Sequence, residues 1–262
     1  IYTLSLHDAL PIFGAGAGCF EGRLKTQKAA CTFQTTYQSF RNMSRAALSK
    51  LQRIFMMQPE HTPLIEFKNV SKRYDNHTAV NELNLTIYQG EFFVLVGGSG
   101  SGKSTTLRMI NALTEPTDGD VYFNGRRIKD YDIRGLRHRI GYVLQQIALF
   151  PTMTVRQNIE LMPDILGWDK SKRTSRVNEL LELVGMPPET YLNRYPHELS
   201  GGEQQRIGIL RAIAAKPDIL LMDEPFSALD PLARASLQET VSLIHKKLGT
   251  TIVSSKDRKS VV

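Results

Sequence analysis

The chain has 262 residues, a formal net charge of +7 and two cysteines. This length can bury a sizeable core, and no apolar run approaches the roughly 18 residues that a membrane-spanning helix needs. The positive charge would suit nucleic-acid binding, but it lies in the flanks: residues 1–55 hold seven Lys or Arg and two Asp or Glu, whereas residues 56–255 hold 23 of each sign. We therefore expect a neutral core and no nucleic-acid partner.

The two ends of the chain share an unusual property. Residues 257–262 can be encoded by a DNA strand whose complement encodes residues 7–12. The DNA resembles a sequencing adapter, so we predict that residues 1–12 and about 255–262 are translated adapter and do not belong to the fold.

Residues 13–56 have two open interpretations. They are either translated DNA upstream of a start at Met56 or Met57, and so non-native or disordered, or they include a basic amphipathic helix over 45–55 for a membrane surface. Both cysteines of the chain lie in this segment. The core therefore needs no disulfide, which suits the cytosol.

The first part of the core predicts a sheet. The runs 65–70, 83–87 and 121–123 are typical of strands, and Asn124-Gly125 indicates a turn. Residues 92–96, all apolar, predict a buried strand. We expect a helix to begin near Gly102 and to carry its apolar residues on one face, namely Leu107, Ile110 and Leu113.

Between that strand and that helix lies a phosphate-loop motif, Gly97-Gly98-Ser99-Gly100-Ser101-Gly102-Lys103-Ser104. Its glycines let backbone N–H groups converge on phosphate oxygens, and the helix N-terminus adds partial positive charge. Lys103 is expected to reach the β- and γ-phosphates, and Ser104 to bind Mg²⁺. The alternative, a Gly/Ser-rich linker, gives no reason for Lys-Ser-Thr at the start of an amphipathic helix.

The middle of the chain predicts helices. From about residue 152 to 199 the pattern is helical, and one helix should present four apolar residues on one face and end at Gly185. These four residues are Val177, Leu180, Leu181 and Val184.

A second apolar strand, 219–222, ends in two acids. Asp223 can hold Mg²⁺ through water, and Glu224 is placed to polarise the attacking water as a general base. A helix N-cap followed by a surface acid is the alternative. Asp230-Pro231 should then open a helix striped by Leu237, Val241, Ile244 and Leu248, which ends at Gly249 before a strand at 250–253.

The ordered motifs give the chain a family resemblance. Leu199-Ser200-Gly201-Gly202-Glu203-Gln204 resembles the signature motif of ABC-type ATPases, and the resemblance covers about residues 64 to 253. By the same resemblance, Tyr74 matches the adenine-stacking aromatic, Gln145 the Q-loop glutamine and Asp230 the end of the D-loop. Taken without the family, Tyr74 could be a half-buried aromatic at a strand end, Gln145 a polar residue after a strand, and Leu199–Gly202 an ordinary capped turn.

The resemblance implies an α/β fold: a P-loop NTPase core of the ABC ATPase type over 57–254, with an antiparallel β subdomain and an inserted α-helical subdomain at about 152–204. It implies a head-to-tail homodimer with two ATP molecules at the interface. One subunit would bind Mg-ATP through the phosphate loop, Thr105, Gln145, Asp223 and Glu224. The other would close on the γ-phosphate with Ser200, Gly201, Gly202 and neighbours such as Gln204, since the backbone of this turn can form an anion nest.

The family also has a histidine after the last strand that contacts the γ-phosphate. Here Val253 is followed by Ser254-Ser255-Lys256, and none of the six histidines follows this strand. We therefore expect the sequence to be a C-terminally truncated fragment that binds ATP and turns it over poorly.

Three stretches narrow the resemblance to ATP-binding subunits of bacterial osmoprotectant importers, which move glycine betaine, carnitine or choline. These stretches are 109–119, 140–151 and 195–208. The partners implied are an integral-membrane permease, docked near 145–151, and indirectly an extracytoplasmic solute-binding protein, with the chain peripheral on the cytoplasmic face of the plasma membrane. An amino-acid or other small-solute importer is the main rival; a non-transport ABC protein and a structural nucleotide-binding module are further alternatives.

Overall fold

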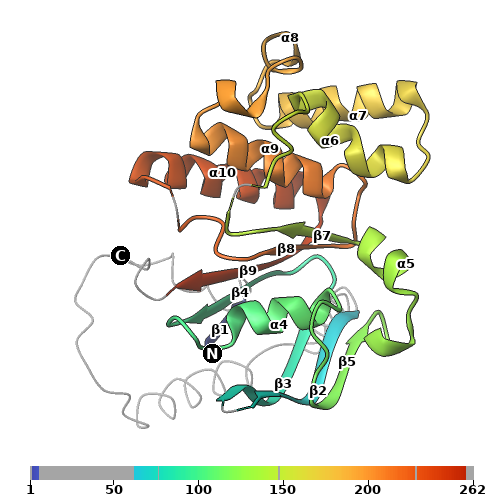
Figure 1. The fold of residues 1–262 in the computed structure, drawn as a ribbon, viewed down its shortest axis with the longest axis vertical. Coiled ribbons are helices and arrows are strands. Elements are labelled where there is room, and N and C mark those ends of the chain that lie inside the picture. Colours follow the sequence, from blue (N-terminus) through green and yellow to red (C-terminus); the bar gives the residue numbers. More distant parts are fainter. Residues whose placement is uncertain (1, 6–61, 76, 147, 228, 258–262) are drawn as a thin grey trace, which may run out of the picture. The chain divides into compact units, whose positions relative to one another are not determined.

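The structure is a computed structural model that describes residues 2–5, 62–75, 77–146, 148–227 and 229–257. The expectations for residues 6–61 and 258–262 lie outside these residues. The chain divides into two units, Ile1–Leu10 with Pro63–Val262, and Pro11–Thr62. All described strands and helices belong to the first unit (Figure 1).

A five-stranded sheet forms the centre of this unit. Its order is β1-β4-β9-β8-β7, and its members are β1 (Tyr2–Ser5), β4 (Phe92–Gly97), β9 (Thr251–Asp257), β8 (Ile219–Met222) and β7 (Ile140–Val143). The last four strands are parallel, and β1 pairs antiparallel with β4. Parallel strands place their carboxyl ends at one edge of a sheet, which is where such sheets bind ligands. The phosphate loop and the two acids follow strands of this sheet.

A second, antiparallel sheet has the order β3-β2-β5-β6. It consists of β2 (Pro63–Tyr74), β3 (His77–Tyr88), β5 (Asp118–Phe123) and β6 (Arg126–Arg127). The two expected strands 65–70 and 83–87 are thus parts of longer strands. The main added parts, residues 71–74 of β2 and 77–82 of β3, are mostly polar and exposed, with only Ser71 and Val80 buried, so no regular apolar pattern indicates them. The backbone pairing nevertheless continues from Pro63↔Tyr88 to Tyr74↔His77.

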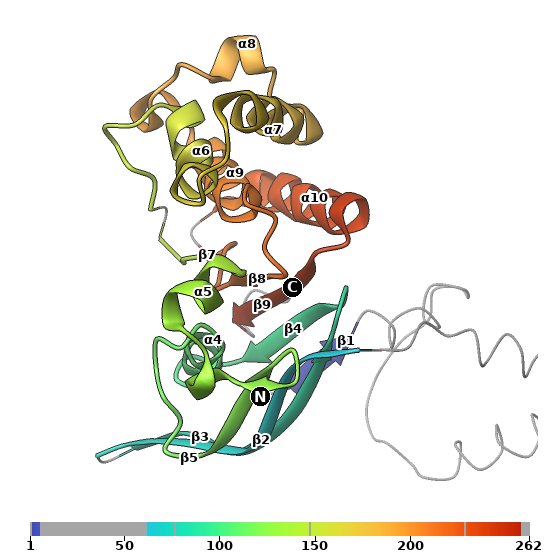
Figure 2. The same cartoon turned by 90° about the vertical axis from the view of Figure 1, so that its right-hand side faces the viewer.

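Helix α4 (Lys103–Ile110) lies between the two sheets (Figure 2). Leu107 and Ile110 are fully buried in a core shared by both sheets, as the pattern predicts. The prediction for Leu113 was wrong, because this side chain is 51% exposed. Ala112 has φ 50°, a left-handed conformation that ends the helix before Leu113 is reached.

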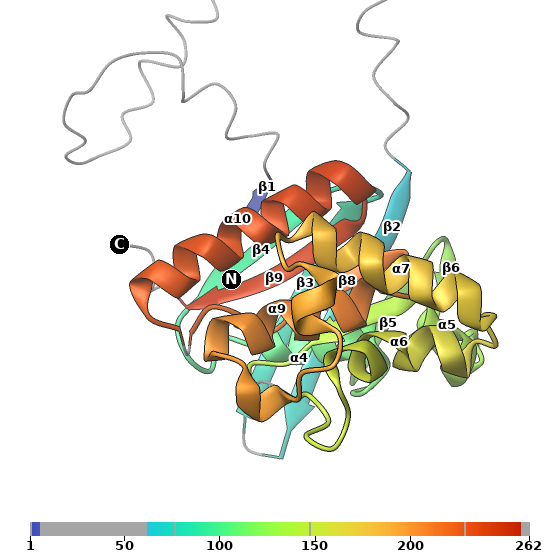
Figure 3. The same ribbon diagram turned by 90° about the horizontal axis from the view of Figure 1, so that it is seen from above.

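The other face of the central sheet carries the helical layer, seen from above in Figure 3. Its main helices are α6 (Val155–Ile165), α7 (Lys170–Leu183), α9 (Gly201–Ile213) and α10 (Pro231–Leu248). Short elements join them and the sheets: η1 (Ile128–Asp130), α5 (Ile133–His138), α8 (Pro188–Tyr191) and η2 (Pro196–Glu198). Successive side chains of β8 point to opposite faces of the sheet. Leu220 packs in the core under the helices, and Leu221 packs in the core around α4.

Local signals in the helical layer are confirmed. The four apolar residues predicted for one face of α7 are all buried, and Gly185, with φ 69°, follows its end. Helix α9 begins at Gly201, directly after its N-cap Ser200. Asp230 is the N-cap of α10 and accepts the N–H of Ala233, while Gly249 ends that helix with φ 62°. Among the described residues, no helix is long and apolar enough to cross a bilayer.

Parts of both segments that were predicted to be foreign lie in the central sheet. Residues Tyr2–Ser5 pair with Phe93–Val96. Strand β9 continues to Asp257, three residues beyond the boundary predicted at 254. The structure therefore includes these residues in the central sheet, and their origin in an adapter stays a prediction.

Candidate functional site

The turn after β4 is built for close approach of a ligand to the backbone. Gly102 has φ 85°, and a Cβ there would lie 2.3 Å from the carbonyl oxygen of Ala79, so only glycine fits. Gly102 is also the N-cap of α4, and no side chain caps this helix. The free N–H groups at its first turn are therefore available to an anion.

Lys103 is held at the base of this turn. Its side chain is 4% exposed, and its Nζ donates to the carbonyl oxygens of Gly97 at 2.9 Å and Gly98 at 3.0 Å. The same Nζ lies 3.4 Å from Oε1 of Glu224. Lys103 and Glu224, predicted from separate motifs 121 positions apart, thus meet at one site.

Asp223 lies at the carboxyl end of β8 and is buried. Its Oδ1 accepts hydrogen bonds from Ser104 Oγ and from Ser255 Oγ, each at 2.9 Å. Ser255 is fully buried. It comes close to Asp223 because the preceding residues of the two strands, Ser254 of β9 and Met222 of β8, are paired in the sheet. The predicted pair of metal ligands, Ser104 and Asp223, is therefore in direct contact.

Glu224 has a constrained backbone. Its φ of 46° is unusual for a residue other than glycine. Its N–H donates to Ser255 Oγ at 2.8 Å, and its carbonyl accepts the hydroxyl of Ser227 at 2.9 Å. These contacts aim the carboxylate back toward Lys103.

These residues border a cleft of about 410 Å³. Its lining includes the phosphate loop from Ser99 to Thr105, together with Tyr74, Gln145 and Glu224. Tyr74 is the last residue of β2 and is 48% exposed, so its ring is available to a ligand. Gln145 is exposed, and its Nε2 lies 3.4 Å from Ser227 Oγ. The cleft therefore joins the adenine, phosphate and Q-loop positions predicted from the sequence.

The signature residues lie elsewhere in the same chain. Ser200 is the N-cap of α9, Gly201 and Gly202 form its first turn, and Gln204 Nε2 donates to the carbonyl of Leu199 at 3.0 Å. Neither they nor Asp230 lines the cleft. The expected head-to-tail dimer requires the signature turn to lie away from the cleft of its own chain. In such a dimer, the turn of one copy would reach the cleft of the other copy.

The charge of Asp223 also acts on a tyrosine of the neighbouring strand. Burial, and after it the nearby charge of Asp223, raise the pKa of Tyr142 to about 12. Tyr142 lies on β7, which pairs with β8, the strand that Asp223 follows. Its hydroxyl therefore stays neutral throughout the physiological range.

The residues present fit a Mg²⁺ ion that arrives with phosphate. The described residues hold no group of three or more His, Cys, Asp or Glu that could bind a metal by themselves. Ser104 and Asp223 supply only two oxygen donors, and Gln145 is the third candidate. Mg²⁺ commonly takes one or two protein oxygens and completes its shell with water and phosphate.

Sequence reasoning missed three contributors to the site. Ser255 was assigned to foreign sequence, yet it contacts both acids. Asp257 and His77 line the cleft and belong to no motif that we recognised. Ser255 could have been found only from its position as the fifth residue of β9, together with the pairing of β9 with β8.

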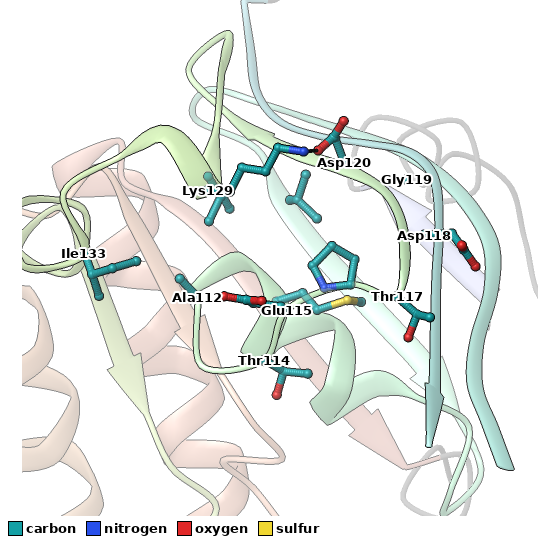
Figure 4. A pocket seen from close by; sticks show the side chains of 13 residues that line it. Ala112, Thr114, Glu115, Thr117, Asp118, Gly119, Asp120, Lys129 and Ile133 are labelled. Atoms are coloured by element: carbon teal, nitrogen blue, oxygen red, sulfur yellow. Dashed lines mark ion pairs between the residues drawn. The ribbon is translucent and has the colours of Figure 1, made fainter. Parts of the chain in front are cut away.

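A second pocket lies apart from the cleft, near the C-terminal end of α4 (Figure 4). It has a volume of about 250 Å³ and is lined partly by residues of the 109–119 stretch, among them Met109, Glu115 and Pro116. Figure 4 shows the Lys129 side chain turned toward Asp120, to which it is ion-paired at 2.5 Å. None of the predicted nucleotide-binding residues lines this pocket.

Comparison with known proteins agrees with this geometry. The ABC transporter family model matches residues 80–227. The choline transport ATP-binding protein OpuBA of Bacillus subtilis is 54% identical over 191 residues, which cover 72% of this chain and 50% of that protein. The glycine betaine uptake system ATP-binding protein YehX of Escherichia coli is 50% identical over 190 residues, 72% of this chain and 61% of its own length. The chain thus spans about half to three fifths of these relatives.

Solved structures agree as well. The dimeric, post-hydrolysis structure of the ATP-binding cassette MJ0796, bound to ADP and Pi, has a TM-score of 0.64 and 35% sequence identity, and covers 74% of this chain and 88% of that one. The family match extends over more than half of the chain. It includes the phosphate loop, the signature turn and both acids of the site. The chain therefore belongs to the ABC transporter family.

Proposed function

We propose that this chain is the ATP-binding and ATP-hydrolysing subunit of a bacterial ABC importer for osmoprotectant quaternary amines. The observation that carries the proposal is the meeting of Lys103, Ser104, Asp223 and Glu224 at one cleft. The solute class is supported by the relatives, which are named for choline and glycine betaine transport. The chain would act peripherally, on the cytoplasmic face of the membrane.

The phosphate loop binds the nucleotide in this proposal. Lys103, now held by two carbonyl groups, turns to the β- and γ-phosphates, while the uncapped start of α4 receives a phosphate anion. Tyr74 stacks on the adenine. Bound Mg²⁺ would neutralise phosphate charge, held by Ser104, Gln145 and, through water, Asp223.

Hydrolysis depends on Glu224 and on a second copy of the chain. Glu224 accepts the proton of the attacking water as general base. Ser200 and the N–H groups of Gly201 and Gly202, from the partner copy, donate to the γ-phosphate. Asp230 contributes to the dimer interface at the start of α10. ATP thus joins the two copies, and its hydrolysis releases them.

A groove between the central sheet and the helical layer suits a permease segment. It has a volume of about 330 Å³, and its lining includes Phe150, Met162 and Arg211. Phe150 is 46% exposed and Leu144, nearby in the chain, is 48% exposed. Arg211 donates to the carbonyl of Ala148 at 2.7 Å, and burial lowers the pKa of Arg211. Ala148, which lines the groove, follows Gln145 by three residues, so a permease segment bound there would influence the nucleotide site through this short stretch of chain.

The test uses Glu224→Gln, which removes the base and keeps the shape of the side chain. With Mg-ATP, this variant should sediment as a dimer and bind one nucleotide per chain, and with Mg-ADP it should be a monomer. Lys103→Met in the same background should abolish the dimer. A Glu224→Gln chain that stays monomeric at saturating Mg-ATP contradicts the proposal.

The solute class needs its own measurement. The chain is co-expressed in parallel with the permease and binding protein of a glycine betaine importer and with those of a methionine importer, and ATP-driven uptake of the matching labelled solute into vesicles is compared. We expect co-purification and uptake with the glycine betaine components only. Co-purification and uptake with the methionine components only would assign the chain to the amino-acid importers instead.

A further inference from the structure

The polar groups of the signature turn, Ser200–Gly202, are engaged by a carboxylate of their own helix. The N–H of Ser200 donates to Oε2 of Glu203 at 2.8 Å, and the hydroxyl of Ser200 donates to the same oxygen at 2.7 Å. The other carboxylate oxygen, Oε1, accepts the hydroxyl of Tyr191 at 2.7 Å. The proton that Ser200 would offer to a phosphate is therefore directed at Glu203.

Glu203 carries its negative charge at neutral pH. Burial acts to raise its pKa, but hydrogen bonds from Ser200 and Tyr191, with the nearby charge of Arg194, lower it overall. The carboxylate is only partly buried, on the first turn of α9. Ser200 itself is exposed, so the turn can meet a ligand from outside.

We propose that the Glu203 carboxylate competes with the γ-phosphate for Ser200 and thereby weakens the ATP-driven closing of the dimer. This inference rests on the proposed function, in which Ser200 of one copy meets the ATP bound by the other. A hydroxyl has one proton, so Ser200 cannot donate to Glu203 and to phosphate together. A phosphate oxygen at hydrogen-bond distance from Ser200 Oγ would lie roughly 4–6 Å from Glu203 Oε2, and two anions at that separation repel.

The charge of Glu203 can be removed without removing its structural role. Glu203 and Ser200 form a capping box, and glutamine serves in that motif as well as glutamate. Glu203→Gln therefore keeps an acceptor for the Ser200 N–H. Glu198 offers a matched control, because it accepts the N–H of Tyr195 at 2.6 Å in the neighbouring η2 turn and makes no hydrogen bond to Ser200.

The experiment measures the Mg-ATP concentration at which half of the chains are dimeric, by sedimentation velocity. All variants carry Glu224→Gln, so that ATP persists. We expect Glu203→Gln to lower this concentration roughly tenfold, equivalent to about 1.4 kcal/mol, and Glu198→Gln to leave it unchanged. Binding of a fluorescent ATP analogue to dilute monomers should be equal in all three, which assigns the effect to closing. Equal melting temperatures show that the fold is intact.

The outcomes separate this inference from the proposed function. If the Glu224→Gln chain dimerises but Glu203→Gln leaves the midpoint unchanged or raises it, the competition is refuted and the proposed function stands. An equal drop in both glutamine variants also refutes it, because any loss of surface charge would then suffice. If no variant dimerises, the proposed ATP-bound dimer is wrong, and the inference fails with it.

Discussion

Ser255 Oγ lies 2.9 Å from Asp223 Oδ1, and the same hydroxyl accepts the N–H of Glu224 at 2.8 Å. One buried side chain on β9 thus links both acids at the end of β8. The link matters because Glu224 has φ 46°, a conformation that persists only where the surroundings hold it. The orientation of the proposed metal ligand and general base therefore depends on a neighbouring strand.

Replacing Ser255 by alanine should destabilise the protein and weaken Mg-ATP binding. The variant leaves the partly buried N–H of Glu224 without its acceptor, which costs about 1–3 kcal/mol in the free energy of unfolding. Urea titration measures this loss. Ser254→Ala is the control, because Ser254 Oγ makes only a 3.5 Å contact with the carbonyl of Ser255. Equal losses in the two variants would show that the link to the acids is unimportant.

Gly102→Ala should abolish nucleotide binding and destabilise the fold. Its Cβ would lie 2.3 Å from the Ala79 carbonyl, on a backbone with φ 85°. We expect a loss of about 1–3 kcal/mol from backbone strain, measured by urea titration. Gly208→Ala is matched, since it lies inside α9 with no atom within 4 Å of its Cβ. That change should stabilise the helix by up to about 1 kcal/mol. Normal ATP binding by Gly102→Ala would contradict the steric argument.

Tyr142 should make stability fall at alkaline pH. Its pKa is raised from 10.0 to about 12, so its contribution is complete below pH 10 and is lost as pH rises to 12, because the unfolded chain ionises first. We expect a loss of about 1–2 kcal/mol across this window, reduced by the partial exposure of the ring. Urea titrations at pH 9 and 11 should show a smaller decrease for Tyr142→Phe. Identical decreases would mean that Tyr142 titrates normally.

Phe150→Asp should weaken association with the permease and leave ATP binding intact. The Phe150 ring is exposed and lies 5.5 Å from the guanidinium of Arg211 at the groove. Ile165→Asp is the control, since Ile165 is 59% exposed at the end of α6 and does not line the groove. Co-purification should fall at least fivefold for the first variant only. A similar fall for both would place the docking surface elsewhere.

Local sequence was sufficient for the elements that carry the phosphate site. The phosphate loop, the strand before it and the acids after β8 are short-range patterns, since each combines an apolar run with residues of special geometry. The two ends of α10 were also predicted from single residues, Asp230 at its N-cap and Gly249 at its C-cap. These signals act within a few residues, so they can be recognised without a fold.

The remaining features depend on contacts between distant parts of the chain. Ser255 meets Asp223 only because Met222 pairs with Ser254 in the parallel sheet, and a single sequence does not reveal that register. The polar halves of β2 and β3 are strands because each pairs with the other. Leu113 fitted the helical period but lies beyond the left-handed Ala112, which no residue preference indicates.

Helix α4 begins without any side-chain cap, so its first turn is incomplete in the protein by itself. In the proposed function, the nucleotide's phosphate supplies what the polypeptide omits and becomes part of the architecture. Ligand that binds only the folded form adds stability that grows with the logarithm of its concentration. The melting temperature of this protein would then rise and fall with the ATP concentration in the cell, so that the protein would unfold at a lower temperature in a cell depleted of ATP.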